Sequence, residues 1–328
     1  MLHLDDDHVR RAPNRPAPGA FGANSSQAYH PPLDWNGLVA YLAPRATPGI
    51  EAIGPDGRYW RSLRLHGHQG YVAVGPAAVG QVLRVQLSAG LVPVLVPLLA
   101  RLRRLLDLDA DPRAVAAHLG GDAVMGPLLS RRPGLRVPGA VDGFELALRA
   151  VLGQQVTVRG ATTLAGRLAR LLAEPLPHAP PQLAYLPISA ERLAGASLAF
   201  VSGIGLPRAR AECVIALARA VASGELPELT SDAPAEDPEA FGRRLRGLPG
   251  IGPWTSDYVA MRALRWRDAF PEGDIGLRKA MGGLSPARLR VAAEAWRPWR
   301  AYAAQHLWAS LGDARADRAT LDSSEGLQ

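Results

Sequence analysis

Leu248-Pro-Gly-Ile-Gly252 is the most informative stretch of this 328-residue sequence, because it has the composition of a tight turn between two helices. Phe241–Gly247 before it and the segment that starts at Pro253 both have helical patterns. Gly250 and Gly252 allow a sharp backbone turn, since neither carries a Cβ atom, and proline is favoured in the first turn of a helix. The stretch therefore predicts a helix-hairpin-helix.

A hairpin of this kind is suited to binding the phosphates of nucleic acid. The first turn of its second helix presents unpaired N–H groups and the positive end of the helix dipole. Gly250 and Gly252 let a phosphate approach these groups, and Thr255 is placed to bind it from the helix start. Such contacts position a duplex without reading its bases. The similar Ser202-Gly-Ile-Gly205 is interpreted as a helix cap with an apolar plug.

The charge of the chain agrees with a polyanionic partner but is weak evidence for one. Lysine and arginine total 37 against 30 acidic residues, which gives a net charge of +7 and a pI near 10.1. Lys279 is the only lysine, so the arginine excess is also what a GC-rich genome would produce. A basic balance raises the expectation of a nucleic-acid partner and does not by itself establish one.

Composition excludes or disfavours several classes of protein. Cys213 is the only cysteine, which excludes an internal disulfide framework and a four-cysteine zinc or iron–sulfur site. The longest apolar run, Ala89–Ala100, contains two prolines and is too short to span a bilayer. The first residues lack a signal-peptide pattern. We expect a cytoplasmic, nucleoid-associated monomer that binds no membrane and requires no cofactor.

The chain divides into a tail, a small β-rich unit, a helical region and a second tail. Residues 1–30 are rich in Pro, Gly, Asn, Ser and charge and are expected to be disordered; residues 314–328 are expected to be frayed. The unit at 31–90 begins with a short helix, Trp35–Leu42. Strands are predicted after it, between Gly, Pro and Asp turn signals, at Ile50–Ile53, Tyr59–His66, Tyr71–Val74 and Gln81–Leu87.

Residues 91–313 are predicted to be almost wholly helical, so the predicted fold class is α+β. Leu95–Leu106 is typical of this region, with apolar residues at helical spacing and an Arg-rich face. Proline and glycine mark the joints between the helices. The other predicted helices are Asp142–Leu152, Thr157–Leu172, Pro207–Ser223, Pro238–Arg246, Trp254–Leu264, Ser285–Trp296 and Trp299–Leu311.

Asp274 follows the hairpin at a spacing that points to a known family. It lies twenty residues after Trp254, behind the loop Phe270-Pro-Glu-Gly273. Together with Leu248–Tyr258, this arrangement resembles the helix-hairpin-helix, Gly/Pro-rich loop and aspartate of base-excision DNA glycosylases. The resemblance is closest to the bacterial 3-methyladenine DNA glycosylase II family and runs from about Pro31 to Leu311.

Several separate motifs carry this resemblance, and they occur in the family's order. They are Pro31-Pro-Leu-Asp-Trp35, Leu87-Ser-Ala-Gly90, Arg132-Pro-Gly-Leu-Arg136, Val151-Leu-Gly-Gln-Gln-Val156, Trp296-Arg-Pro-Trp-Arg-Ala-Tyr302 and His306-Leu-Trp308. The resemblance implies an N-terminal β-rich lobe similar to half of a TATA-binding protein. Two mainly helical lobes would follow, with the active-site cleft between them.

Asp274 is the expected catalytic residue. Cleavage of a glycosidic bond passes through an oxocarbenium-like sugar, and a carboxylate beside C1′ stabilises that charge and orients or deprotonates the attacking water. The alternative is a helix N-cap. The hairpin twenty residues upstream favours the catalytic role.

Trp254 predicts how the reaction proceeds. In bifunctional members of the superfamily, the lyases, the helix after the hairpin carries a lysine near this position. Without an amine there is no Schiff base, so the sequence predicts a monofunctional glycosylase that uses water. The resemblance implies that its substrate is double-stranded DNA with alkylated bases. A bifunctional enzyme and a non-enzymatic DNA-binding module are the two alternatives.

The resemblance implies an aromatic base pocket. Trp254 and Tyr258 are four residues apart and share a helix face, and Trp308 joins them in the family. Tyr41 and Arg45 correspond to positions where the β-rich lobe reaches the pocket. Alkylated purines such as 3-methyladenine are cationic, and an aromatic face attracts a cation by roughly 0.5–2 kcal/mol. The alternative is that these aromatic residues belong to the core.

Gln155 occupies the position from which the family fills the gap left by a flipped base, with Gln154 beside it. Glutamine fills this space and hydrogen-bonds the orphaned base; the alternative is a solvent-facing helix end. Gly276 replaces a bulkier residue of the family and leaves the lesion preference open. The resemblance also implies a monovalent cation at the hairpin, bound by the carbonyls of Arg246, Leu248 and Ile251.

Overall fold

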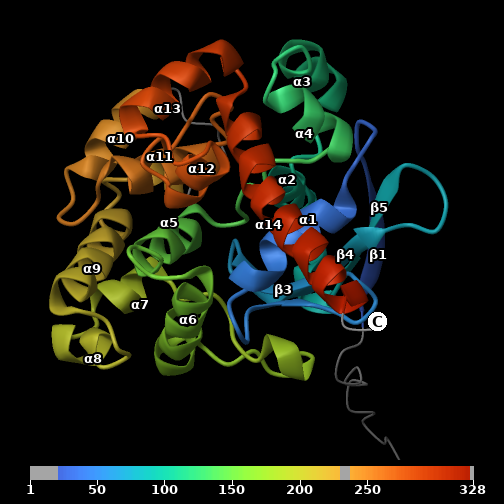
Figure 1. Ribbon diagram of the computed structural model, residues 1–328. Coiled ribbons are helices and arrows are strands. Elements are labelled where there is room, and N and C mark those ends of the chain that lie inside the picture. Colours follow the sequence, from blue (N-terminus) through green and yellow to red (C-terminus); the bar gives the residue numbers. More distant parts are fainter. Residues whose placement is uncertain (1–20, 230–236, 326–328) are drawn as a thin grey trace, which may run out of the picture.

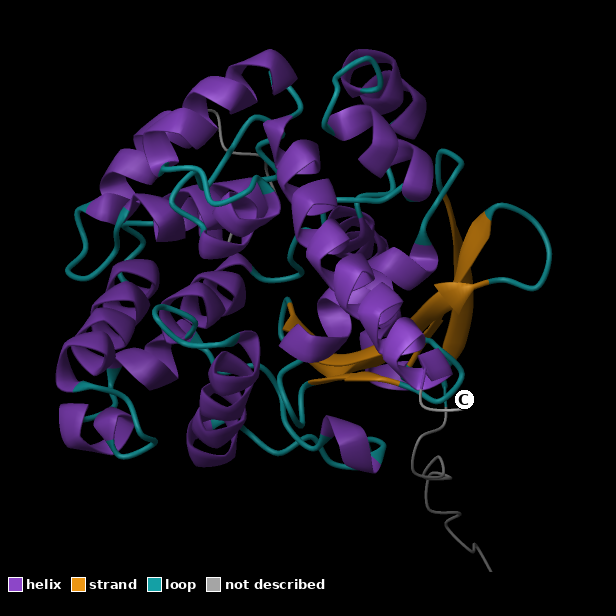
Figure 2. Cartoon of the chain, viewed as in Figure 1, coloured by secondary structure: helices purple, strands orange, loops and turns teal. Residues whose placement is uncertain are grey.

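The computed structural model describes residues 21–229 and 237–325, and within them the chain has the predicted α+β class. Figures 1 and 2 show one antiparallel sheet at one side of a mainly helical molecule. Among the described residues, no helix is both long enough and apolar enough to cross a membrane.

The sheet has five antiparallel strands in the order β1-β5-β4-β3-β2. The four strands predicted from sequence are confirmed as β2 to β5, with small changes at their ends. The strand bounds are β1 Ala23–Ala28, β2 Glu51–Ile53, β3 Tyr59–Leu65, β4 His68–Pro76 and β5 Val82–Leu87.

Strand β1 corrects the prediction of a disordered tail through residue 30. It pairs with β5 along its whole length, from Ala23 opposite Leu87 to Ala28 opposite Val82. Its sequence is short and polar, so it lacks the apolar alternation by which strands are detected. An edge strand of this kind is held by the backbone ladder of its neighbour. Residues 1–20 of the predicted tail lie outside the described residues.

The core of the N-terminal unit lies between the sheet and two helices. Helix α1 (Trp35–Leu42) has its predicted bounds and is capped by Asp34, whose Oδ1 accepts a 2.7 Å hydrogen bond from the Gly37 N–H. Helix α2 (Leu95–Leu106) packs its apolar face into the same cluster. The buried face of α2, although it follows residue 90, therefore belongs to the same apolar cluster as the sheet.

The remaining described residues form the helical part of the molecule (Figure 1). The helices predicted there are confirmed, with starts within one residue of those expected. The bounds are α3 Pro112–Leu119, α4 Met125–Arg131, α5 Gly143–Leu152, α6 Val158–Leu172, α7 Ala190–Ala194, α8 Leu198–Ser202, α9 Arg208–Ala222, α10 Pro238–Arg246, α11 Pro253–Arg262, α12 Ile275–Ala280, α13 Pro286–Ala293 and α14 Arg300–Glu325. Short 3₁₀ turns lie at η1 Ala43–Arg45, η2 Ala89–Val94, η3 Pro181–Leu183, η4 Pro227–Leu229 and η5 Glu294–Trp296.

Helix α14 ends much later in the chain than predicted. It continues to Glu325, so residues 314–325 are helical and the expectation of a frayed end is wrong for them. Gly312 does not end the helix, and the sequence from Asp313 to Glu325 contains no further glycine or proline that would terminate it. The short helices α3, α4, α7, α8 and α12 were not predicted, because one or two turns carry little periodicity.

Candidate active site

The hairpin lies between α10 and α11, as its sequence predicts. Gly250 has a φ of +80°, a conformation that favours glycine, and an added Cβ there would lie 3.1 Å from the Cβ of Cys213 on α9. Ile251 is 5% exposed and packs into the helical core. A Cβ added at Gly252 would meet no described atom within 4 Å, so the backbone at the start of α11 is open to close approach.

Asp274 is the N-cap of α12 and also the centre of the site. Its Oδ1 accepts a 2.9 Å hydrogen bond from the Leu277 N–H, which is the cap, and another of 2.9 Å from the indole Nε1 of Trp308. Its Oδ2 accepts a 2.8 Å hydrogen bond from the indole Nε1 of Trp254. A helix cap and a catalytic carboxylate are therefore compatible roles for Asp274, because the cap bond and the indole bonds orient the same carboxylate.

The aromatic residues predicted for a base pocket lie together around this carboxylate. The rings of Trp254 and Tyr258 are stacked, with centroids 5.5 Å apart and an interplanar angle of 9°. The Trp308 ring meets Tyr258 edge-on at 6.2 Å and lies 6.3 Å from the ring of Tyr41. These rings come from three separate segments of the chain and are not simply core residues, since all four line a cavity of about 990 Å³.

The N-terminal unit supplies one wall of the cavity through Tyr41 and Arg45. The hydroxyl of Tyr41 lies 3.1 Å from the hydroxyl of Tyr258 on α11. The Arg45 guanidinium stacks over the Tyr41 ring, with Cζ 3.8 Å from the centroid, and Nη1 donates a 2.9 Å hydrogen bond to the Tyr41 carbonyl. One face of Tyr41 is therefore covered by a cation of the protein itself.

Arg262 is a site residue that the sequence analysis missed. It is 6% exposed, and Nη1 donates a 2.7 Å hydrogen bond to the Tyr258 hydroxyl. Its other nitrogens bind the carbonyls of Pro138 and Gly139 at 2.7 and 2.9 Å. The sequence did contain one signal for it: Arg262 lies four residues after Tyr258 and therefore on the same helix face.

The environment of Tyr258 changes the acidity of its phenol. Burial alone would raise the pKa, but the positive charges of Arg262 and Arg45 oppose this effect. Hydrogen bonds with Tyr41 and Arg262 add to the stabilisation of the phenolate, and the pKa of Tyr258 falls to about 8. Burial and the neighbouring Tyr258 raise the pKa of Tyr41 well above its usual value. The pocket thus contains one tyrosine that is easily ionised and one that is not.

A group of charged residues also lines the cavity, where β2, β3 and α5 meet. Arg61 Nη2 donates a 2.6 Å hydrogen bond to Glu145, and Glu51 lies 3.7 Å from Arg61 Nη1. Burial raises the pKa of Glu145, Arg61 lowers it and Glu51 raises it again, giving a value of about 7. Nearby, Arg149 donates a 2.8 Å hydrogen bond to the Arg45 carbonyl. The sequence contained no local signal for this group, because its members come from distant segments.

The loop after α5 lies against the hairpin. Gln154 Nε2 donates hydrogen bonds to the Gly250 carbonyl at 2.9 Å and to Thr255 Oγ1 at 3.0 Å. Gln155 is exposed with a φ of +55° and lines the cavity. Thr255 is 2% exposed, and its hydrogen bond with Gln154 holds the loop to the hairpin. Its contact with a phosphate stays a prediction.

Nearly all of the predicted site residues line this one cavity. They are Tyr41, Arg45, Gln154, Gln155, Gly250, Gly252, Trp254, Thr255, Tyr258, Asp274 and Trp308. The predicted cation ligands Arg246, Leu248 and Ile251 lie outside it, at the hairpin. The carbonyl of Leu248 accepts a 3.2 Å hydrogen bond from the Ile251 N–H.

Comparisons with known proteins agree with this arrangement. The chain has the fold of the 3-methyladenine DNA-glycosylase of Archaeoglobus fulgidus, with a TM-score of 0.72 and 20% identity over 87% of this chain and 97% of that chain. The family model described as the AlkA N-terminal domain matches residues 26–142. The fold is therefore that of a helix-hairpin-helix DNA glycosylase.

Two curated relatives are similar to most of the chain. The chain is 38% identical over 284 residues to DNA-3-methyladenine glycosylase 2 of Escherichia coli (strain K12), which is 87% of this chain and 96% of that protein. It is 40% identical over 284 residues to the probable bifunctional transcriptional activator/DNA repair enzyme AlkA of Mycobacterium tuberculosis (strain ATCC 25618 / H37Rv), and it matches 55% of that protein's length. The chain belongs to the DNA-3-methyladenine glycosylase 2 family.

Proposed function

We propose that the protein is a monofunctional DNA glycosylase of base excision repair. It flips alkylated, cationic purines such as 3-methyladenine out of duplex DNA and hydrolyses the N-glycosidic bond, leaving an abasic site. Membership in the DNA-3-methyladenine glycosylase 2 family supports the reaction class. The observation that carries the proposal is the Asp274 carboxylate, oriented by two indole N–H groups inside an aromatic cavity.

Asp274 acts on the sugar. As the bond between C1′ and the base breaks, its electron pair leaves with the base and C1′ becomes positively charged; the nearby carboxylate stabilises that charge. A carboxylate accepts about four hydrogen bonds, and Trp254, Trp308 and Leu277 N–H occupy three of these positions. The remaining position, on Oδ2, faces the attacking water. The water oxygen bonds to C1′, and its proton passes to Asp274 or to solvent.

The aromatic rings bind the flipped base. A cationic purine is attracted to the faces of Trp254, Tyr258 and Trp308 by roughly 0.5–2 kcal/mol per contact. Alkylation already makes the base a good leaving group, so the reaction requires no general acid. The cavity of about 990 Å³ is larger than a single purine, which supports a broad substrate range.

Water is the proposed nucleophile because none of the described residues brings an amine into the cavity. Lys279 is the only lysine of the sequence; it is exposed on α12 and does not line the cavity. Schiff-base chemistry needs a lysine or another amine at the sugar. The proposal therefore excludes a lyase step.

The hairpin and the loop after α5 bind the DNA. Phosphate contacts at the start of α11, where Gly252 leaves the backbone open, hold the duplex. Gln155 then enters the stack as the base leaves. A cation bound by the carbonyls of Arg246, Leu248 and Ile251 would strengthen the phosphate contact, and DNA affinity would then fall when Na⁺ and K⁺ are replaced by tetramethylammonium at constant ionic strength. We expect a monomer acting at the bacterial nucleoid.

One assay tests the reaction. The protein is incubated with methylated duplex DNA, and released bases are compared with strand nicks before alkali treatment. Base release without nicking is the expected result. Nicking would instead indicate a bifunctional enzyme, and the absence of release from any alkylated DNA would leave a non-enzymatic DNA-binding module.

A variant tests the role of Asp274. Asp274→Asn keeps the shape of the side chain but removes its charge, so we expect base release to fall by several orders of magnitude. Binding to abasic-site DNA should persist, because the hairpin is unchanged. Both are measured on the same duplex, by release under single turnover and by fluorescence anisotropy. Normal release by the variant would mean that Asp274 serves only as a helix cap.

A further inference from the structure

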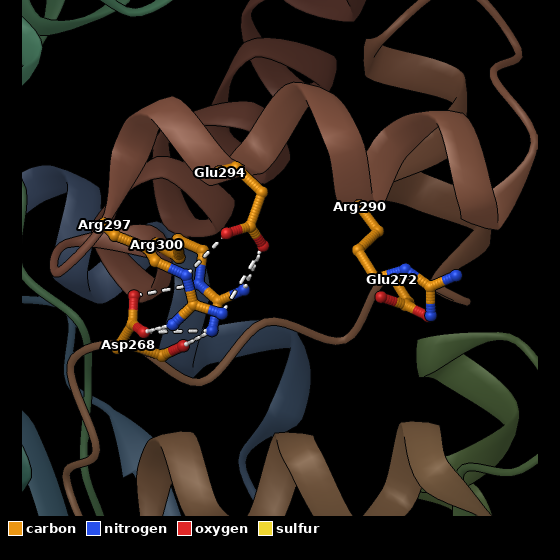
Figure 3. Close-up of polar contacts among 6 residues, drawn as sticks. All are labelled: Asp268, Glu272, Arg290, Glu294, Arg297 and Arg300. Atoms are coloured by element: carbon orange, nitrogen blue, oxygen red, sulfur yellow. Dashed lines mark hydrogen bonds and ion pairs between the residues drawn. The ribbon is translucent and has the colours of Figure 1, made fainter.

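Helix α14 contacts the loop between α11 and α12 at two points. At the end of this loop, Trp308 donates its indole hydrogen bond to Asp274. In the middle of the loop, Asp268 is bound by Arg300, the first residue of α14 (Figure 3). The reaction proposed above uses only the first contact.

The second contact is an extensive one. Arg300 Nε donates a 2.8 Å hydrogen bond to Asp268 Oδ1, and Nη2 donates to Oδ2 at 3.0 Å and to the Asp268 carbonyl at 2.7 Å. The two side chains are only 10% and 14% exposed. The backbone joins in, since the Ala301 N–H donates a 2.9 Å hydrogen bond to the Arg267 carbonyl.

Two more residues complete the cluster in Figure 3. Arg297 also donates to the Asp268 carboxylate, and its Nε donates a 2.8 Å hydrogen bond to Glu294. Glu294 in turn lies 3.5 Å from Arg300 Nη1. Charge-assisted and bidentate contacts of this kind restrict orientation more than single ion pairs do. Asp268 is therefore held in place by two arginines that flank the start of α14.

The same loop carries a much weaker ion pair for comparison. Arg290 on α13 lies 3.1 Å from Glu272 through a single contact, and the side chains are 57% and 31% exposed. Figure 3 shows this pair apart from the Asp268 cluster. Exposed single pairs contribute little, even though Glu272 is closer to Asp274 in sequence than Asp268 is. The Arg290–Glu272 pair is thus a natural control.

The geometry of α14 connects its two contacts. A helix rises about 1.5 Å per residue, so Trp308 lies about 12 Å along the axis from Arg300. A helix with its first residue fixed to the loop has little freedom to slide or rotate. A shift of about 1 Å at Trp308 would stretch its 2.9 Å hydrogen bond to Asp274 beyond the normal range.

We infer that Arg300 is a positioning residue for the proposed reaction. Through Asp268 it holds α14 against the loop, so that Trp308 keeps the Asp274 carboxylate turned toward the sugar. The inference rests on the proposed function, because it concerns the same carboxylate. Its competitor is a purely structural ion pair that stabilises the fold without affecting the orientation of Asp274.

The first test compares Arg300→Met with Arg290→Met. For Arg300→Met, single-turnover base release should fall about tenfold to a hundredfold, while affinity for abasic-site DNA changes less than about threefold at a temperature where both proteins are folded. Arg290→Met should match the wild type in both. Arg300→Lys keeps the charge but loses the bidentate contact, so it should release bases at an intermediate rate. It replaces Arg300→Met if that variant does not fold.

A double-mutant cycle separates positioning from stability. Trp308→Phe removes the indole N–H, and if Arg300 acts through that group, its substitution should have little further effect on release in the Trp308→Phe background. Fully multiplicative effects, or equal losses in Arg300→Met and Arg290→Met, would overturn the inference.

A measurement without catalysis keeps the two proposals distinguishable. The indole N–H resonance of Trp308, assigned by its loss in Trp308→Phe, reports its hydrogen bond to Asp274. It should move upfield in Arg300→Met and stay unchanged in Arg290→Met. An unchanged resonance would refute the positioning role even if the wild type released bases normally. A wild type that releases no base would refute only the proposed function.

Discussion

Asp274 performs two tasks with one carboxylate. It begins α12 by accepting the Leu277 N–H, and it accepts the indole N–H groups of Trp254 and Trp308. The cap bond fixes the backbone of the residue, while the indoles fix the rotation of its side chain. The catalytic role that we propose for Asp274 needs both, because a small misplacement of a reacting group is costly in rate.

Gly276 lies close to the Asp274 carboxylate and to the Trp308 ring. An added Cβ would lie 3.0 Å from Asp274 Oδ1 and 3.2 Å from Trp308 Cδ1, which is tighter than normal contact. We therefore expect Gly276→Ala to push these groups apart and to lower base release about tenfold or more, with abasic-site DNA binding little changed. Release and binding assays on one duplex measure both. If Gly276→Ala released bases at the wild-type rate, Asp274 and Trp308 would be able to move apart without loss of function.

Tyr258 should titrate unusually early. Burial raises its pKa, but Arg262 and Arg45 and the hydrogen bonds from Tyr41 and Arg262 lower it to about 8. A phenolate signal should therefore appear in ultraviolet difference spectra between pH 7 and 9, and should be absent from Tyr258→Phe. Above this pH the pocket gains a negative charge, so affinity for a cationic lesion should rise relative to a neutral one. A titration that begins only near pH 10 would contradict the prediction.

The two glycines of the hairpin have different tasks. Gly250 needs its positive φ and lies against Cys213, whereas Gly252 has an extended conformation with open space beside it. Gly250→Ala should therefore destabilise the fold by about 1 kcal/mol or more. Gly252→Ala should leave stability unchanged and weaken binding to all DNA sequences alike, because its Cβ occupies the space of a phosphate.

Thermal unfolding and DNA-binding measurements on the two hairpin variants separate these effects. The binding assay is repeated with duplexes of different sequence, since backbone contact carries no sequence preference. Loss of binding that depends on sequence would argue against a phosphate contact at Gly252. Equal destabilisation by both substitutions would argue against the different roles of the two glycines.

Helices from distant segments form the pocket together. Tyr41 on α1 reaches Tyr258 on α11, a contact between residues 217 positions apart. The η1 turn is held in place by α5 and α6, since Arg149 binds the Arg45 carbonyl and Thr162 Oγ1 donates a 2.7 Å hydrogen bond to the Pro44 carbonyl. The wall that the β-rich unit contributes is therefore fixed by helices that follow it in the chain.

The pH dependence of the free energy of unfolding should depend on His306. This residue of α14 is 3% exposed, and burial, only partly opposed by Asp34, lowers its pKa to about 4. The folded protein then binds fewer protons than the unfolded chain between pH 4 and 6.5, so stability falls as the pH decreases through this range. The difference corresponds to about 3 kcal/mol at most.

Urea unfolding at pH 4 to 7 tests the role of His306. His306→Gln should reduce the loss of unfolding free energy between pH 6.5 and 4. His118→Gln, at an exposed position of α3, should leave that loss unchanged. Equal slopes for the wild type and His306→Gln would mean that other groups cause the acid sensitivity.

Local patterns were sufficient for much of the fold, and the resemblance to a known family supplied the interpretation of the site. The hairpin, most strands and the long helices follow from glycine, proline and apolar periodicity over a few residues. The spacing of Asp274 from Trp254 and the single lysine needed only counting. These features depend on neighbours in the sequence, so the sequence by itself determined them.

Only the tertiary structure decided which distant groups meet. Strand β1 exists because β5 offers it a backbone edge, and Thr255 is buried because Gln154 covers it. Arg262 and Arg300 gain their importance from partners on other segments. Hydrogen bonds and ion pairs between residues far apart in the chain leave no local pattern, and for this reason they could not be predicted from the sequence.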